Sequence, residues 1–126
     1  MHIAAYPYVI LFVQGFYYAI TALWPLIHIK SFLQVTGPKH DIWLVKTVSL
    51  LLFADAILFL AAAAAKQISL PVIYFSCLTA ILLSCVDIYY AASGVIRKIY
   101  LADALAEIVI IAMWCYHFLY DGHNYS

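Results

Sequence analysis

Apolar residues run along the chain in four long stretches that short polar connections separate. Each stretch is long enough to cross about 30 Å of hydrocarbon at a helical rise of about 1.5 Å per residue. The pattern predicts membrane-spanning helices near residues 3–29, 42–65, 70–92 and 95–120. We therefore expect an all-α integral membrane protein, in which a single domain, residues 1–126, forms an antiparallel four-helix transmembrane bundle.

Proline and glycine mark the expected bends and turns. Pro25 lies inside the first run, where it removes a backbone hydrogen bond and predicts a bend near Trp24. Gly37 and Pro38 predict a turn before the second run, and residues 31–35 could form a short amphipathic helix ahead of it. The N-terminus has no basic segment before its apolar run, so we expect that run to be retained as a span.

Two of the four runs carry polar residues at helical spacing. Steps of three and four residues place side chains on one face of a helix. In the first run this face includes Gln14, Tyr17, Thr21, Trp24 and His28. In the last run it includes Tyr100, Asp103, Glu107 and Trp114. Because an ionised carboxylate in hydrocarbon is costly, we expect this face of the last helix to meet protein, water or a ligand.

The composition supports this interpretation. Hydrophobic residues make up 68% of the chain and charged residues 10%, which is too little charge to cover a water-soluble domain. The formal net charge is zero, so the chain has no basic surface that would attract a nucleic-acid backbone. Nucleic acid is therefore excluded as an expected partner.

The basic residues predict the orientation in the membrane. One side of the bundle carries a single base near the helix ends, Lys66, whereas the other side carries five, namely Lys30, Lys39, Lys46, Arg97 and Lys98. Because basic residues accumulate in cytoplasmic connections, the bias predicts that both termini lie outside.

Four acids lie at matching depths in the predicted spans. Asp55 and Glu107 are each about twelve residues from the cytoplasmic ends, or about 18 Å deep, and Asp87 and Asp103 share a level about 10 Å deep. Within a span, Lys46 is the base that could reach the shallower level. The excess of acid predicts that at least one carboxyl is protonated, unless a cation, a cationic ligand or water compensates the charge.

These residues form the candidate site. Asp55, Asp87, Asp103 and Glu107 are the candidates for proton transfer or catalysis. The candidates for ligand binding are Gln14, Tyr17, Thr21, Trp24, His28, Lys46, Tyr100 and Trp114. An alternative is that neutral carboxyls only tie helices together by hydrogen bonds, as other polar side chains in membranes do.

We expect neither a metal nor another cofactor. His28 and His117 lie near opposite ends of their spans and could not both ligate one haem iron. The Glu-x-x-His spacing of di-iron bundles is also missing.

The chain resembles small bacterial membrane proteins with four spans that are grouped with DoxX-like proteins. The stretches that carry the resemblance are TALWPLIHIKSFLQVTGPKHDIWLVKTVSLLL and DIYYAASGVIRKIYLADALAEI. The resemblance implies a four-span fold in a bacterial inner membrane, and it assigns no activity and no site residue. In size and number of spans the chain is also similar to small multidrug resistance transporters, but its first span has Gln14 and no glutamate.

Three functions fit these patterns. The first is a carboxylate-lined site within the membrane that binds, and in a further hypothesis transforms, a membrane lipid or small amphipathic molecule. The second is proton-coupled or cation transport, which a chain this short would perform as a homodimer. The third is a structural subunit whose partner buries the acids.

Overall fold

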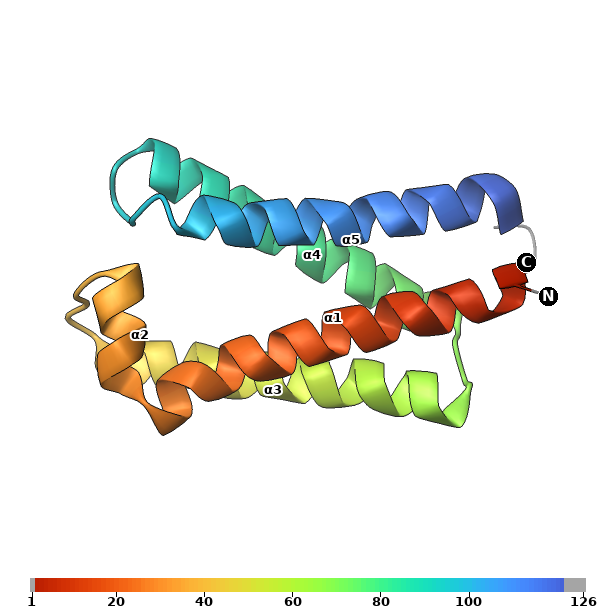
Figure 1. Ribbon diagram of the computed structural model, residues 1–126, viewed down its shortest axis with the longest axis horizontal. Coiled ribbons are helices and arrows are strands. Elements are labelled where there is room, and N and C mark those ends of the chain that lie inside the picture. Colours follow the sequence, from red (N-terminus) through yellow and green to blue (C-terminus); the bar gives the residue numbers. More distant parts are fainter. Residues whose placement is uncertain (1, 122–126) are drawn as a thin grey trace.

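The computed structural model describes residues 2–121, which form five helices and no strand. The helices are α1 (His2–Ile27), α2 (Ile29–Thr36), α3 (Ile42–Ala65), α4 (Leu70–Ala92) and α5 (Tyr100–Asp121). Within the described residues, α1, α3, α4 and α5 are long and apolar enough to cross a membrane (Figure 1). The predicted all-α bundle with four membrane-spanning helices is confirmed.

The bundle consists of two helix pairs. α1 packs along α3, and α4 packs along α5, while the two pairs meet mainly through α1 and α5 (Figure 1). Glycine permits the close approach within the first pair, since a Cβ on Gly15 would lie 2.7 Å from Leu60 Cγ and 3.3 Å from the Ala56 carbonyl oxygen. The chain passes from one pair to the other through the short connection after α3, where Lys66 adopts a left-handed conformation with φ of 56°.

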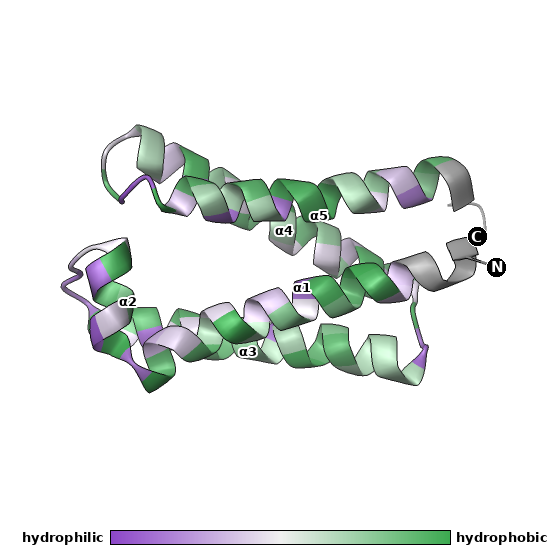
Figure 2. Cartoon of the chain, in the orientation of Figure 1, coloured by the Kyte–Doolittle hydropathy of each residue, from purple (hydrophilic) through white to green (hydrophobic). Residues whose placement is uncertain are grey.

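The outer surface of the bundle is apolar. Figure 2 shows hydrophobic residues along the long helices and hydrophilic residues gathered at the connections. Large side chains such as Ile20 and Leu119 are 68% and 81% exposed. In a membrane-spanning bundle such residues face lipid, so their exposure carries no cost.

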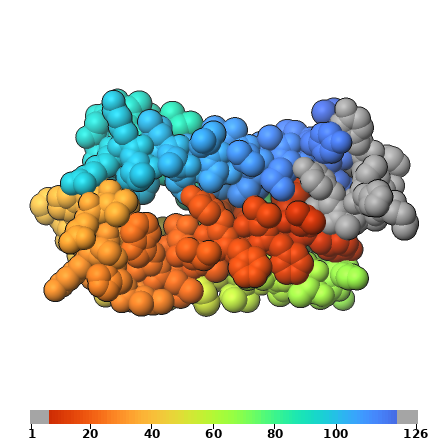
Figure 3. Space-filling view, viewed as in Figure 1, coloured from red at the N-terminus to blue at the C-terminus, as the bar shows by residue number. Residues whose placement is uncertain are grey.

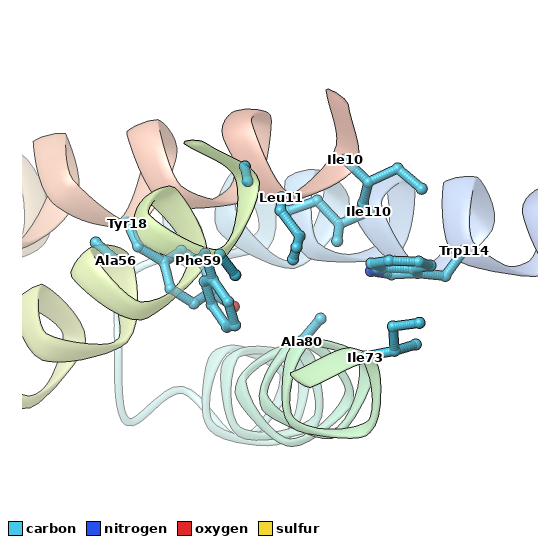
Figure 4. Close-up of a cluster of buried hydrophobic side chains, with 11 residues drawn as sticks. Ile10, Leu11, Tyr18, Ala56, Phe59, Ile73, Ala80, Ile110 and Trp114 are labelled. Atoms are coloured by element: carbon cyan, nitrogen blue, oxygen red, sulfur yellow. The ribbon is translucent and has the colours of Figure 1, made fainter. Parts of the chain in front are cut away.

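The apolar core lies toward the end of the bundle where α1 begins and α5 ends (Figures 1 and 4). Figure 4 shows Ile10 and Leu11 of α1, Phe59 of α3, Ile73 of α4 and Trp114 of α5 in one cluster. All five side chains are buried. The two helix pairs are thus joined by close packing at this end.

The helix boundaries differ from the expected ones at two bends. α1 continues through Pro25 to Ile27, and the chain turns at His28, whose φ of −142° is not helical. The short helix expected around residues 31–35 is present as α2. α5 begins at Tyr100 because residues 93–99 form turns, in which Gly94 has a positive φ of 79°.

Candidate functional site

Two adjacent tyrosines of α1 donate hydrogen bonds to two acids of α5. The Tyr18 hydroxyl donates to Glu107 Oε1 at 2.7 Å, and the Tyr17 hydroxyl donates to Asp103 Oδ1. Glu107 and Tyr18 are each 1% exposed, whereas Tyr17 and Asp103 are half-buried. Because the two acids are one turn apart, both tyrosines can reach the same face of α5.

A buried hydrogen-bond network continues from Tyr18 to the other helices. Gln14 Nε2 donates to the Tyr18 hydroxyl at 3.1 Å and to the Ser76 carbonyl at 3.2 Å. The Ser76 hydroxyl donates to Gln14 Oε1 and accepts from Trp114 Nε1 at 2.8 Å. Since an indole nitrogen can only donate, the direction of these bonds is fixed from Trp114 toward Glu107. The network joins α1, α4 and α5 at the packed end of the bundle.

A third acid, Asp87 of α4, lies beside this network. It is 7% exposed and has Asp103, Glu107 and Tyr17 as its titratable neighbours. Its buried Oδ2 atom has no hydrogen-bond partner among the described residues. Buried polar atoms are normally satisfied, so an open acceptor at this point is unusual. We call Asp87, Asp103 and Glu107 the acid cluster.

The two helix pairs diverge toward the α2 end of the bundle (Figure 1). Figure 3 shows the molecule hollowed between the last turns of α1 with α2, in orange, and the first turns of α5, in cyan to blue. Asp103 is in the first turn of α5, which borders this hollow, and the Tyr17 hydroxyl reaches it there. We call this hollow the lateral opening.

α2 and the loop after it lie across the far end of the lateral opening (Figure 1). Arg97 Nη1 donates to the Gln34 carbonyl at 3.2 Å. Lys39 Nζ lies 5.4 Å from the ring centroids of Phe32 in α2 and of Tyr100 in α5. These contacts close the end of the opening, while its side remains open between α1 and α5.

The structure gathers six of the predicted site residues in one place. They are Gln14, Tyr17, Asp87, Asp103, Glu107 and Trp114. Thr21 follows Tyr17 by one turn and is half-buried, so it lies on the same face of α1 toward the opening. Tyr100 is half-buried next to Lys39 at the closed end of the opening.

The other predicted residues lie apart from the acid cluster. Trp24 Nε1 donates to Ser31 Oγ at 2.8 Å, and His28 Nδ1 accepts from the Ser31 backbone N–H at 3.2 Å, so both stabilise the turn into α2. Asp55 is half-buried on α3, and no hydrogen bond of the described residues joins it to the cluster. Lys46 is exposed near the start of α3.

Two residues of the network, Tyr18 and Ser76, were not among the predicted site residues. Tyr18 follows Gln14 by four residues, so helical spacing could have included it as readily as Tyr17. Ser76 is a polar residue in the middle of an apolar run, but its spacing does not indicate which neighbour it meets.

The chemistry of the site is that of a hydrogen-bond acceptor. The described donors to Asp103 and Glu107 are neutral tyrosine hydroxyls, and Asp87 Oδ2 accepts nothing. Among the described residues, no group of three or more histidine, cysteine or acidic side chains has an arrangement that could hold a metal ion. The arrangement can therefore accept a hydrogen bond or a positive charge from a polar group entering through the opening.

Comparison of the chain with protein-family models, curated proteins and solved structures found no match.

Proposed function

We propose that the protein binds a lipid-like or small amphipathic molecule within the membrane. Its polar head would lie against the acid cluster and its apolar tail would leave through the lateral opening. Tyr17 and Tyr100 are half-buried beside this path and offer apolar ring faces with polar edges, which suits such a molecule.

Asp87 Oδ2 is the observation that carries this proposal. It is a buried acceptor without a described partner, at the point where α1, α4 and α5 converge beside the lateral opening. A purely structural acid would gain most from a hydrogen-bond donor to its buried oxygen, as Glu107 Oε1 has in Tyr18. A bound polar head supplies the missing donor.

A relay of protons through the whole network is less well supported than binding. The chain of hydrogen bonds from Trp114 to Glu107 passes through the amide of Gln14. A side-chain amide has no proton-exchange form of low energy, unlike a carboxyl, hydroxyl or imidazole group. The bonds around Gln14 therefore suit a fixed frame that positions Tyr18 and Glu107.

The proposal includes an orientation. Lys30, Lys39, Arg97 and Lys98 lie at the α2 end of the bundle, and Lys66 lies at the other end. The positive-inside rule places the α2 end in the cytoplasm of a bacterial cell and both termini outside its inner membrane. The lateral opening then faces the cytoplasmic half of the bilayer.

Photolabelling tests the proposed binding. Two photoactivatable alkyl probes with the same diazirine tail, one with a hydroxyl and one with an ammonium head, are added to the full chain in maltoside micelles. We expect saturable labelling by at least one probe at residues that border the opening, Tyr17, Thr21 or Tyr100, mapped by mass spectrometry. Labelling spread evenly over the lipid-facing surface for both probes would contradict the proposal.

A matched pair of variants provides the control. Thr21→Trp places an indole at the opening, whereas Ile20→Trp places the same group at a neighbouring position that is 68% exposed on the outer surface. We expect Thr21→Trp to abolish the saturable labelling and Ile20→Trp to leave it unchanged. Equal labelling in both variants would show that the probe binds elsewhere.

A further inference from the structure

We infer that the polar head of the bound molecule carries a positively charged nitrogen, so that the ligand is an alkylammonium compound. This inference rests on the proposed function and adds the chemical class of the ligand. The observation behind it is the balance of charge and hydrogen bonds around the acid cluster. Three carboxyl groups from two helices are neighbours there, and the Asp87 and Asp103 side chains are within hydrogen-bonding reach of each other. The other groups that donate to the cluster among the described residues are two neutral hydroxyls.

The bases at the same end of the bundle are either exposed, as Lys30 and Lys98 are, or engaged elsewhere. Lys39 Nζ donates to the Thr36 hydroxyl at 2.9 Å and to the Thr36 and Gly37 carbonyls, and Arg97 donates to the Gln34 carbonyl. Lys46 is exposed. Hence no base that the structure describes at this end pairs with a carboxyl of the cluster by a hydrogen bond.

An ammonium head fits this site better than a hydroxyl or an anion. Its N–H groups can donate to Asp87 Oδ2, and its charge stabilises the ionised form of the neighbouring carboxyl groups in surroundings of low dielectric. A carboxylate or phosphate head would be repelled by the same acids. The half-buried ring of Tyr17 offers additional attraction to a cation.

The geometry favours an organic cation over a metal ion. Ligands of a metal converge on one point at about 2–2.6 Å, and the described acids do not form such a group. An alkylammonium donates hydrogen bonds from a larger head and needs no such convergence. The lateral opening also provides a path for its tail toward the bilayer.

An ammonium group could come from a free amphiphilic amine or from phosphatidylethanolamine. The lipid carries a phosphate next to its amine, and that phosphate would lie near the three acids. The charge of the cluster therefore favours the free amine, which has no anionic group.

Displacement of the photoactivatable ammonium probe tests the inference. The competitors are dodecylammonium, dodecanol, dodecanoate and a short-chain phosphatidylethanolamine, all added to the full chain in maltoside micelles. We expect dodecylammonium to displace the probe at a concentration about tenfold or more below that of the other three, as one charge-assisted hydrogen bond allows. Equal displacement by dodecanol would overturn the inference while leaving the proposed binding intact. Displacement by the phospholipid as strong as that by dodecylammonium would show that the source is a lipid, against the proposal of a free amine.

Asp87→Asn provides the second arm, because asparagine keeps the shape of the side chain and removes its charge. We expect the half-displacement concentration of dodecylammonium to rise about tenfold or more and that of dodecanol to change less than about threefold. Asp41→Asn makes the same substitution at an exposed position before α3 and should change neither value. If Asp87→Asn fails to fold, Asp103→Asn is expected to reduce the preference for dodecylammonium in the same way. An unchanged preference in a folded variant of either acid contradicts the inference.

Discussion

Tyr18 of α1 and Glu107 of α5 are joined by a hydrogen bond of 2.7 Å, and each side chain is only 1% exposed. The bond connects the two helix pairs through groups that neither lipid nor water reaches. Glu107 therefore depends on this particular hydroxyl, because no solvent can replace it. The neighbouring bond from Tyr17 to Asp103 lies in a more open place, where both side chains are half-buried.

Tyr18→Phe is therefore expected to destabilise the fold more than Tyr17→Phe. Removing the Tyr18 hydroxyl leaves Glu107 Oε1 and Gln14 Nε2 short of a partner, which costs about 1–3 kcal/mol. We expect Tyr17→Phe to lower the free energy of unfolding by about 0.6 kcal/mol, which is common for hydrogen bonds between membrane helices. Unfolding in mixed micelles with increasing dodecyl sulfate measures both. A larger loss for Tyr17→Phe would contradict the assigned burial of the two bonds.

Ser76→Ala tests the centre of the network. The substitution removes the acceptor of Trp114 Nε1 and the donor to Gln14 Oε1, so two buried polar groups lose a partner. We expect a destabilisation of about 2 kcal/mol or more, measured in the same unfolding experiment.

Ser84→Ala is the matched control for Ser76→Ala. Ser84 Oγ donates at 2.9 Å to the Ile81 carbonyl of its own helix, so no other helix loses a partner. We therefore expect Ser84→Ala to lower the free energy of unfolding by less than about 0.5 kcal/mol. Similar losses at the two serines would show that the network does not join the helices.

Gly15→Ala is expected to loosen the contact between α1 and α3. The new methyl group would lie 2.7 Å from Leu60 Cγ and 2.8 Å from Leu60 Cδ2, so the helices or the leucine must move. Overpacking of this kind costs about 1–3 kcal/mol. Leu60→Ala makes room for the methyl group. The free energy of unfolding of the double variant should therefore fall by less than the sum of the decreases in the two single variants. Additive losses would indicate that Gly15 and Leu60 are not in contact.

Asp55→Asn tests whether the site consists of the three acids of the acid cluster or also includes Asp55, as the sequence predicts. Asp55 has no hydrogen bond to the acid cluster among the described residues, so its substitution should leave the displacement of the ammonium probe by dodecylammonium unchanged. The same displacement experiment checks this. A rise in the half-displacement concentration of dodecylammonium comparable to that for Asp87→Asn would show that Asp55 belongs to the site.

The sequence predicted the membrane-spanning helices well because their signal is local. Twenty or more apolar residues between polar connections identify a span without knowledge of its neighbours. The positions of Gln14, Tyr17, Asp103 and Glu107 on common helix faces also follow from spacing alone. These residues are the part of the candidate site that could be predicted with a physical reason.

The rest depends on how each helix is rotated about its axis. Counting residues placed Asp55 and Glu107 at the same depth, but depth does not determine the direction in which a side chain points. The same limit applies to Trp24 and His28, which continue the polar face of α1 but meet Ser31 at the turn into α2. Tyr18 was missed because one residue along a helix changes the direction by about 100°, and both Tyr17 and Tyr18 are compatible with a face that includes Gln14.

The division of the bundle into two helix pairs has a consequence for biogenesis. The tyrosine donors are in the first half of the chain and the acids they bind are in the second. Translation delivers α1 and α3 to the bilayer first, so the carboxyls of α5 enter after their partners and gain these hydrogen bonds only when the second hairpin docks on the first. The docking of the two hairpins, and not the insertion of any single span, is then the step that completes the buried contacts between the two halves of the chain.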